Sequence, residues 1–367
     1  RRHQRDPAQH HRPARVGHAP LVKADMSEAP VGIGIIGSGY MGRTYAECVA
    51  RYNHGAHLVA VAGGSRAPSL ASDYGVDSEP NIEGLLAREE IQAVIVTSPQ
   101  SAHAEQTIAA ARHGKHVLVE KPMATSSAEC RRMIEACDAE GVSLSVIKPW
   151  RYRGSTRRLH ERIQRGDIGD VRMITLWWLY PRVPFIGKDW FRDAKEGGFF
   201  LDAGSHCFDY LRWVAGAEPS RLYAQVATYN ADSETPRSTM TIVTFDNGVM
   251  ANLWLSYEVP APGWANTDFR ARVVGASGIL DAHGYGALQL GRDDGWETLF
   301  EQAPMDFINR PLERVRLEAF FDMTQDWIDA IADGRQPPVT GADGLAAVAM
   351  VEAGYRSSAL GQAVDLA

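Results

Sequence analysis

The stretch VGIGIIGSGYMG, residues 31–42, decides how the rest of this chain is interpreted. Its apolar beginning predicts a buried strand, and three glycines then stand in the order Gly-x-Gly-x-x-Gly directly before a helical pattern. The first glycine permits a tight turn, the second lets a pyrophosphate approach the backbone, and the third lets helix and strand pack closely. Free N–H groups at the start of the helix attract phosphate. A glycine-rich turn without a ligand is the alternative; we predict a dinucleotide-binding loop, formed by Gly37, Gly39, Tyr40, Met41 and Gly42.

Outward from this loop, strand and helix patterns alternate as far as Lys148. Further strands are expected at residues 57–65, 93–99, 116–122 and 143–147, and helices at residues 43–52, 66–75, 103–114 and 126–141. Near-continuous apolar strands separated by helices indicate a parallel sheet that is covered on both faces. Residues 26–149 are therefore predicted to form an α/β Rossmann domain with a doubly wound parallel sheet.

The pattern changes in residues 150–367. A helix expected at 155–166 leads into a long strand at 171–181, and a second helix covers 201–215. Later segments are typical of antiparallel strands, with Asp246-Asn247-Gly248 as a hairpin turn. These strands are expected at residues 221–229, 238–259, 268–284 and 287–291, and the closing helices at residues 313–333 and 342–359. We predict an α+β C-terminal domain with an antiparallel sheet.

The first 25 residues differ from everything after them. They hold six Lys or Arg and two Asp with little apolar content, so they cannot bury enough surface to offset the entropy of ordering. We interpret residues 1–25 as a disordered or vector-derived extension. Their net charge is +4 (six minus two), so the chain total of −7 leaves −11 for residues 26–367. A body this acidic has no general affinity for nucleic acid.

Composition narrows the class of protein further. The chain has 45% hydrophobic and 23% charged residues, and no apolar run approaches the roughly 18 residues of a membrane helix. Its four cysteines form no Cys-x-x-Cys pair and suggest no disulfide framework, which fits a reducing cytoplasm. These cysteines are Cys48, Cys130, Cys137 and Cys207.

The end of the second predicted strand indicates which dinucleotide would bind. A carboxylate at this place would hold the ribose 2′-hydroxyl of NAD, but the sequence here is VAGGSRAP, with Ser65 and Arg66 and no acidic residue. A hydroxyl beside a guanidinium suits a 2′-phosphate, because Arg offers paired, charge-assisted hydrogen bonds. The alternative is that Arg66 stacks on the adenine or points to solvent. We expect NAD(P), with NADP favoured over NAD.

Two more strands end at the same edge of the sheet. TSPQSAH, residues 97–103, could pack against the nicotinamide ribose, and EKP, residues 120–122, brings Lys121 to the rim of the cofactor crevice. Lys121 could otherwise be a solvated charge, and the peptide before Pro122 could be cis. The further cofactor-binding residues predicted here are Thr97, Ser98, Pro99, His103, Glu120, Lys121 and Pro122.

The segment GGFFLDAGSHCFDY, residues 197–210, places an acid and a base on one face of a helix. Asp202 and His206 are four residues apart and therefore one turn apart. The plain alternative is a solvated helix face that carries a carboxylate and an imidazole. A metal site from Asp202, His206, Cys207 and Asp209 fails, because Cys207 lies on the opposite side of the helix from His206.

Four motifs in this order, GSGYMG, TSPQSAH, HVLVEKP and GGFFLDAGSH, resemble those of the glucose–fructose oxidoreductase/inositol dehydrogenase (Gfo/Idh/MocA) family from about Val31 to the end of the chain. The resemblance implies a Rossmann domain and a C-terminal domain on an open antiparallel sheet. DWFRD, residues 189–193, resembles the Trp-Arg element that often precedes the last motif. One departure is Glu196-Gly197-Gly198, where three glycines are common.

The same resemblance implies the chemistry. The family's catalytic lysine, aspartate and histidine match Lys121, Asp202 and His206. Oxidation of a secondary alcohol of a sugar, inositol or polyol needs a base, for which the imidazole of His206 qualifies with a pKa near neutrality. Lys121 would stabilise developing alkoxide charge, and Asp202 would hold a neighbouring hydroxyl. Further predicted substrate-binding residues are Lys148, Trp150, Arg151 and Tyr152, with Tyr152 or Tyr180 as the alternative base.

Three matters stay open at this point. The dinucleotide could serve transient oxidation of a sugar followed by elimination, as in glycoside-cleaving relatives, or the protein could be a non-catalytic dinucleotide sensor. The open sheet leaves a face that suits association, so we expect a homodimer or homotetramer. We expect a small-molecule partner, with no metal, nucleic acid or membrane involved.

Overall fold

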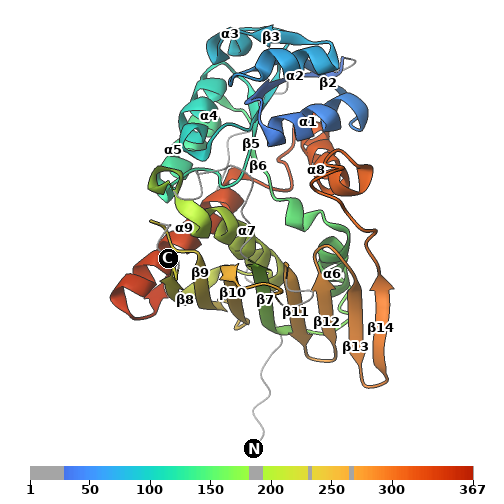
Figure 1. Ribbon diagram of the computed structural model, residues 1–367, viewed down its shortest axis with the longest axis vertical. Coiled ribbons are helices and arrows are strands. Elements are labelled where there is room, and N and C mark those ends of the chain that lie inside the picture. Colours follow the sequence, from blue (N-terminus) through green and yellow to red (C-terminus); the bar gives the residue numbers. More distant parts are fainter. Residues whose placement is uncertain (1–28, 182–192, 230–233, 264–267, 367) are drawn as a thin grey trace, which may run out of the picture.

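The computed structural model describes residues 29–181, 193–229, 234–263 and 268–366. Figure 1 shows two parts, a parallel sheet with its helices at one end and a larger, mainly antiparallel sheet at the other. Helices α7 and α9 lie on the face of the larger sheet that is turned toward the first part. The two predicted fold classes are confirmed. The extension predicted at residues 1–25 lies outside the described residues.

The first sheet is parallel, with strands in the order β3-β2-β1-β4-β5-β6. Its strands are β1 (Val31–Ile36), β2 (Ala56–Ala62), β3 (Asp77–Glu79), β4 (Ala93–Val96), β5 (His116–Val119) and β6 (Leu144–Val146). Its helices are α1 (Tyr40–Arg51), α2 (Ala67–Tyr74), α3 (Ile82–Leu86), α4 (His103–Arg112) and α5 (Ser127–Glu140). Alternate strand residues face opposite layers, because Ile33 and Ile35 pack with α1, whereas Val94 and Val96 pack with α4 and α5. The predicted strands and helices of this domain form, and β3 and α3 are additional.

The second sheet follows the order β14-β13-β12-β11-β7-β10-β9-β8-β15 among the described residues. Its strands are β7 (Val171–Pro181), β8 (Pro219–Ala227), β9 (Ser238–Phe245), β10 (Met250–Val259), β11 (Arg270–Gly275), β12 (Ile279–His283), β13 (Leu288–Arg292), β14 (Gly295–Phe300) and β15 (Val364–Asp365). Neighbours pair antiparallel in this part of the chain except β7 and β10, which are parallel. The predicted hairpin joins β9 to β10, where Gly248 adopts a φ of 85°.

The remaining helices connect and cover the two sheets. They are α6 (Gly154–Gln164), α7 (Gly198–Ala215), α8 (Arg314–Ala332) and α9 (Gly341–Leu360). Helix α8 is late in the sequence, yet Leu317, Phe320 and Trp327 belong to the core that also holds β1 and α1 of the Rossmann domain. The predicted domain boundary between residues 149 and 150 therefore separates the two sheets. Helix α8, which follows that boundary in the sequence, nevertheless packs on the Rossmann domain. Figure 1 shows α8 beside α1.

Candidate active site

The glycine-rich loop has the shape that a dinucleotide needs. Gly37 adopts a φ of 108°, and a Cβ there would lie 2.7 Å from the Thr97 carbonyl carbon. A Cβ on Gly42 would overlap the carbonyl oxygen of Gly37, so helix α1 packs closely on the strand. At Gly39 the nearest atom to such a Cβ is Nη2 of Arg66 at 3.7 Å, so this glycine borders open space. A side chain there would fill the space that a pyrophosphate needs.

The start of helix α1 is uncommitted. Gly39 is its N-cap residue and makes no side-chain cap, and the first turn contains no acidic residue. Backbone N–H groups and the positive end of the helix dipole therefore remain for an anion. Together with the open space at Gly39, this arrangement fits the pyrophosphate of NAD(P).

The end of β2 lies beside this loop. The Ser38 hydroxyl donates to the carbonyl oxygen of Gly63 at 2.9 Å, which ties the two strand ends together. Ser65 and Arg66 follow and are exposed. Arg66 forms no ion pair with a described carboxylate, and its guanidinium reaches over Gly39. The preference for a 2′-phosphate stays a prediction.

The ends of β4 and β5 are held together by His103. Its Nδ1 lies 3.0 Å from the Pro122 carbonyl oxygen, and its Nε2 lies 3.0 Å from that of Ser98. Because both ring nitrogens face protein carbonyls, His103 positions the two loops and has no ring nitrogen left for a cofactor. The Lys121–Pro122 peptide bond is cis, as the sequence allowed. The Thr97 hydroxyl lies 3.0 Å from the carbonyl oxygen of Gly37.

Glu120 is buried behind the catalytic candidate that follows it. Its carboxylate accepts a hydrogen bond from the backbone N–H of Lys121 at 2.8 Å. Burial raises the pKa of Glu120 to about 7, against the opposing charge of Lys121. This carboxylate holds the backbone of the EKP motif in place.

Lys121 and Asp202 meet across the two domains. Lys121 Nζ lies 2.6 Å from Asp202 Oδ1, which joins the end of β5 to the first turns of α7. Asp202 is 8% exposed and His206 is 7% exposed. In α7 all residues except Arg212 and Trp213 are buried, so the alternative of a solvated helix face is wrong. The structure thus brings together the three residues that the resemblance singled out.

His206 carries an uncommitted nitrogen in this cluster. Its Nδ1 is buried and has no hydrogen-bond partner in the structure as described. Burial lowers the pKa of His206 well below its ordinary value, and the charges of Lys121 and Lys148 lower it further. The imidazole is therefore neutral at neutral pH and can accept a proton from a bound hydroxyl group.

The four residues predicted to bind substrate just after the first domain divide into two groups. Lys148 and Trp150 lie near the cluster: Lys148 Nζ donates to the Ser205 carbonyl oxygen at 3.2 Å, and the Trp150 ring lies 6.5 Å from the His206 ring. Arg151 and Tyr152 instead bind carboxylates elsewhere.

Arg151 binds Asp209 through Nε at 2.9 Å and Nη2 at 2.6 Å, and it also contacts Asp343 at 3.0 Å. The Tyr152 hydroxyl donates to Asp326 on α8 at 2.8 Å. Both side chains are held by partners away from Asp202 and His206. We therefore withdraw Arg151 and Tyr152 as substrate-binding candidates and Tyr152 as the alternative base.

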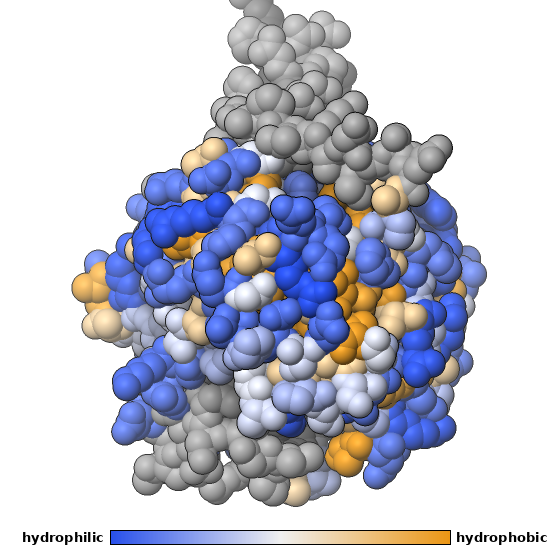
Figure 2. Space-filling model, turned by 90° about the horizontal axis from the view of Figure 1, so that it is seen from above, coloured by the Kyte–Doolittle hydropathy of each residue, from blue (hydrophilic) through white to orange (hydrophobic). Residues whose placement is uncertain are grey.

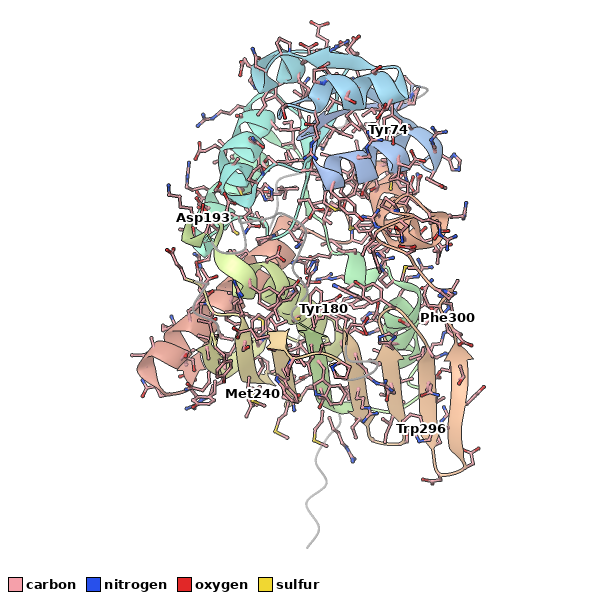
Figure 3. All side chains as sticks on the ribbon, viewed as in Figure 1. Tyr74, Tyr180, Asp193, Met240, Trp296 and Phe300 are labelled. Carbon is pink, nitrogen blue, oxygen red and sulfur yellow. The ribbon has the colours of Figure 1, made fainter. Side chains whose placement is uncertain are left out.

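Trp178 is a site residue that the sequence reasoning missed. Its ring centroid lies 5.7 Å from that of His206, and its indole Nε1 is buried without a hydrogen bond of normal geometry. Tyr180, two residues later on β7, projects from the same face toward the space between the two sheets (Figure 3). Burial raises the pKa of Tyr180 to about 12, so it is a poor base at neutral pH. The alternation in WWLY carried this signal, because residues i and i+2 of a strand share a face.

The described residues contain neither a metal-binding cluster nor a membrane-spanning helix. No group of three or more His, Cys, Asp or Glu side chains is placed to hold a metal ion. No helix in the described ranges is long and apolar enough to cross a membrane. The Trp-Arg element at residues 189–193 lies, apart from Asp193, outside the described residues.

Comparisons with known proteins cover most of the chain. The family model described as an oxidoreductase family with an NAD-binding Rossmann fold matches residues 31–148, and the GFO/IDH/MocA C-terminal domain matches residues 156–281. The inositol 2-dehydrogenase of Rhizobium meliloti is 27% identical over 92% of this chain and 99% of its own length. The D-xylose 1-dehydrogenase (NADP(+)) 2 of Haloferax volcanii is 26% identical over 91% of this chain and 99% of its own length. The crystal structure of a putative myo-inositol dehydrogenase from Sinorhizobium meliloti 1021, 27% identical, has a TM-score of 0.78 over 92% of this chain and 100% of that one.

Proposed function

The chain belongs to the Gfo/Idh/MocA oxidoreductase family, and from that premise we propose that it transfers a hydride between nicotinamide and a secondary alcohol or ketone carbon of a sugar, inositol or related polyol. The observation that carries the proposal is the contact of Lys121 with Asp202 beside His206, whose Nδ1 has no hydrogen-bond partner among the described residues. Relatives named for inositol and xylose support the substrate class.

The chemistry follows from these side chains. When bound, a nicotinamide dinucleotide supplies the acceptor or donor of the hydride. In the oxidative direction His206 takes the proton that leaves the substrate oxygen. The Lys121 ammonium donates a hydrogen bond to that oxygen and stabilises its developing negative charge. Asp202 fixes Lys121 and accepts a hydrogen bond from a neighbouring hydroxyl group of the substrate. In the reductive direction the same groups act in reverse.

A substrate screen tests this proposal. Purified protein is incubated with NAD or NADP and a panel that includes myo-inositol, D-xylose and D-glucose, and the absorbance of the reduced nicotinamide is followed. We expect turnover of at least one compound, lowered by about 10²–10³ in Lys121→Met. Turnover near the parental rate in this variant would show that the chemistry uses other groups. A glycoside in the same panel, cleaved without net cofactor reduction, would support the elimination reaction instead.

We propose NADP as the preferred cofactor, because Ser65 and Arg66 stand where a carboxylate would select NAD. Arg66→Ala should weaken NADP binding by about 1–3 kcal/mol, the value of a charged hydrogen bond, and NAD binding by much less. The measurement is the pair of dissociation constants. Equal effects on both dinucleotides would contradict the 2′-phosphate assignment.

We also propose that the chain forms a homodimer or homotetramer through the open face of the second sheet. On this face Met173, Tyr223, Met240, Ile242 and Met250 are exposed on neighbouring strands. Figure 3 shows Met240 projecting from the side opposite the helices, whereas the end of the molecule seen in Figure 2 is mainly hydrophilic. Light scattering should give an oligomer mass for the parent and a monomer mass for Met240→Glu combined with Ile242→Lys. A monomeric parent would contradict the proposal.

The buried free thiols support a reducing cytoplasm as the location.

A further inference from the structure

Two arginines are buried between helices α1, α6 and α8. Arg316 is 2% exposed and Arg153 is 6% exposed. Arg316 Nη2 donates to the Thr44 hydroxyl at 3.1 Å, and Arg316 Nη1 donates to the carbonyl oxygen of Pro311 at 2.5 Å. Arg153 Nη1 donates to the carbonyl oxygen of Arg316 at 2.8 Å. The Arg153 guanidinium is thus linked to the backbone of Arg316, and both guanidinium groups are held by neutral oxygens.

Neither arginine is paired with a carboxylate of the described residues. In the part of the chain that the structure describes, no Asp or Glu forms an ion pair with Arg153 or Arg316, and Glu318 acts on Arg153 only from a distance. Aromatic faces take the place of a counter-ion, since the Phe320 ring lies 5.2 Å from the Arg316 guanidinium and 5.3 Å from that of Arg153. Burial lowers the pKa of both groups. A guanidinium nevertheless stays protonated in proteins, so the interior holds two positive charges that form no ion pair with a described carboxylate.

The position of this pair relates it to the glycine-rich loop. The Arg316 guanidinium lies 4.6 Å from the centroid of the Tyr40 ring, and Tyr40 is the first residue of α1 directly after Gly39. Its hydrogen-bond acceptor Thr44 lies on the next turn and donates to the Tyr40 carbonyl oxygen at 3.0 Å. Uncompensated positive charge therefore lies beneath the helix end that has free N–H groups and no acidic residue in its first turn.

We propose that Arg316, with Arg153 behind it, is a positioning and affinity residue for the dinucleotide, supplied by α8 from the C-terminal half of the chain. Its charge adds to the positive end of α1, and its contacts with Tyr40 and Thr44 hold the first turn in place. Buried charges are screened less than surface charges, so the contribution should persist in salt. The inference rests on the proposed dinucleotide site and is independent of hydride transfer.

The test measures binding and needs no substrate. NADPH and NADH are titrated into the parent, Arg316→Gln and Arg314→Gln, and the change in nicotinamide fluorescence gives each dissociation constant. Arg314 is the matched control, because it lies two residues earlier on the same helix with a side chain that is 69% exposed. We expect Arg316→Gln to weaken both dinucleotides by about tenfold or more, as for a unit charge lost near an anion in a partly buried site. Arg314→Gln should stay within about twofold.

Two further variants separate charge from folding. Arg316→Lys keeps the charge and should restore binding to within a few-fold of the parent. Arg153→Gln removes the second charge, leaves Arg316 in place, and should weaken both dinucleotides several-fold. This variant decides the matter even where Arg316→Gln does not fold, as checked by circular dichroism.

The outcomes are distinct. A folded Arg316→Gln or Arg153→Gln that binds both dinucleotides as the parent does would overturn the inference. So would an Arg316→Lys that is no better than Arg316→Gln, since the effect would then not be one of charge. A parent that binds neither dinucleotide would overturn the proposed function as well.

Discussion

Helix α7 carries two acidic positions that look alike in the sequence and are used differently in the structure. Among the described residues, the Asp202 carboxylate forms an ion pair only with Lys121, and Nδ1 of His206, one turn further along α7, has no hydrogen-bond partner. Asp209, two turns further on, receives two N–H groups from Arg151 and lies 4.0 Å from Lys148. The first position leaves hydrogen-bonding capacity for a ligand, and the second leaves hardly any.

The charged cluster around Asp209 extends beyond α7, and its members bind one another; we call it the closed cluster. Arg151 also contacts Asp343, which Arg212 binds at 2.7 Å. Burial alone would raise the pKa of Asp343, but the charges of Arg151 and Arg212 and the hydrogen bond from the Thr340 N–H together outweigh it and lower the value to about 2. A buried ion network of this kind favours folding only while each member keeps its partner. We infer that the group on α7 with unused hydrogen-bonding capacity, Asp202 with His206, serves catalysis. The fully bonded group, Asp209, anchors the helix.

The largest effect on activity should come from the cluster of Lys121, Asp202 and His206, in which hydrogen bonding is incomplete. His206→Ala should lower kcat by about 10²–10⁴, the usual contribution of a general base. Lys121→Met should lower kcat by about 10²–10³, because an apolar side chain cannot stabilise the alkoxide. The two losses should be strongly non-additive, since both groups serve one proton transfer. In His206→Ala, dinucleotide affinity and the melting temperature should change little, whereas Lys121→Met leaves the buried carboxylate of Asp202 without its partner and should also lower the melting temperature.

A near-parental kcat in His206→Ala would place the base elsewhere. Tyr180 would then remain as the alternative that the sequence offered, although burial raises its pKa. Asp202 and His206 would then not be the catalytic position of α7.

The closed cluster should respond in stability. Asp209→Asn leaves Arg151 and Lys148 buried without their shared carboxylate, so the free energy of unfolding should fall by about 3–5 kcal/mol. Urea denaturation measures this change. The control is Asp73→Asn, which breaks an exposed pair with Arg43 and should cost about 1 kcal/mol or less. Equal costs in the two variants would refute the distinction between anchoring and surface pairs.

Much of this contrast could not be predicted from the sequence. The glycine-rich loop, the alternating strands and the i, i+4 spacing of Asp202 and His206 are local patterns, so the fold class and the candidate cluster could be predicted. The partners of Arg151 and Tyr152 come from α7, α8 and α9, and such long-range contacts leave no local trace. Trp178 had a local signal in the alternation of β7. The packing of α8 against α1 had none, and with it Arg316 was missed.

The acid limb of the kcat/KM profile should lie below the pH at which an ordinary histidine titrates. Because burial and nearby lysines lower the pKa of His206, its base form persists below the ordinary value of about 6.5. In the oxidative direction kcat/KM should therefore fall only as the pH drops below that value, by about tenfold per pH unit. The limb should be absent in His206→Ala.

Stability limits the range over which this profile can be measured. Below about pH 6.5 the unfolded chain binds a proton at His206 before the folded chain does, so the free energy of unfolding decreases as the pH falls. His116 and His160, whose pKa values burial lowers to about 4, act in the same direction. Circular dichroism at each pH separates loss of base function from unfolding. A limb at or above pH 7 in folded protein would contradict the assignment.

The smallest expected effect concerns Lys148, which lies between the two clusters. Its charge lowers the pKa of His206, and its Nζ is 4.0 Å from Asp209. Lys148→Met removes that charge, so the pKa of His206 should rise and the acid limb of kcat/KM should move toward neutrality by about one pH unit or less, as expected for one partly screened charge. Stability should change little, because Asp209 keeps both bonds from Arg151 and an apolar side chain of similar length suits the buried position. Lys195→Met, an exposed lysine just before α7, is the matched control and should leave the limb in place. If Lys148→Met instead shifted the limb to lower pH, the two clusters would not be coupled in the way their geometry indicates, and Lys148 would belong with Arg151 to the anchoring network alone.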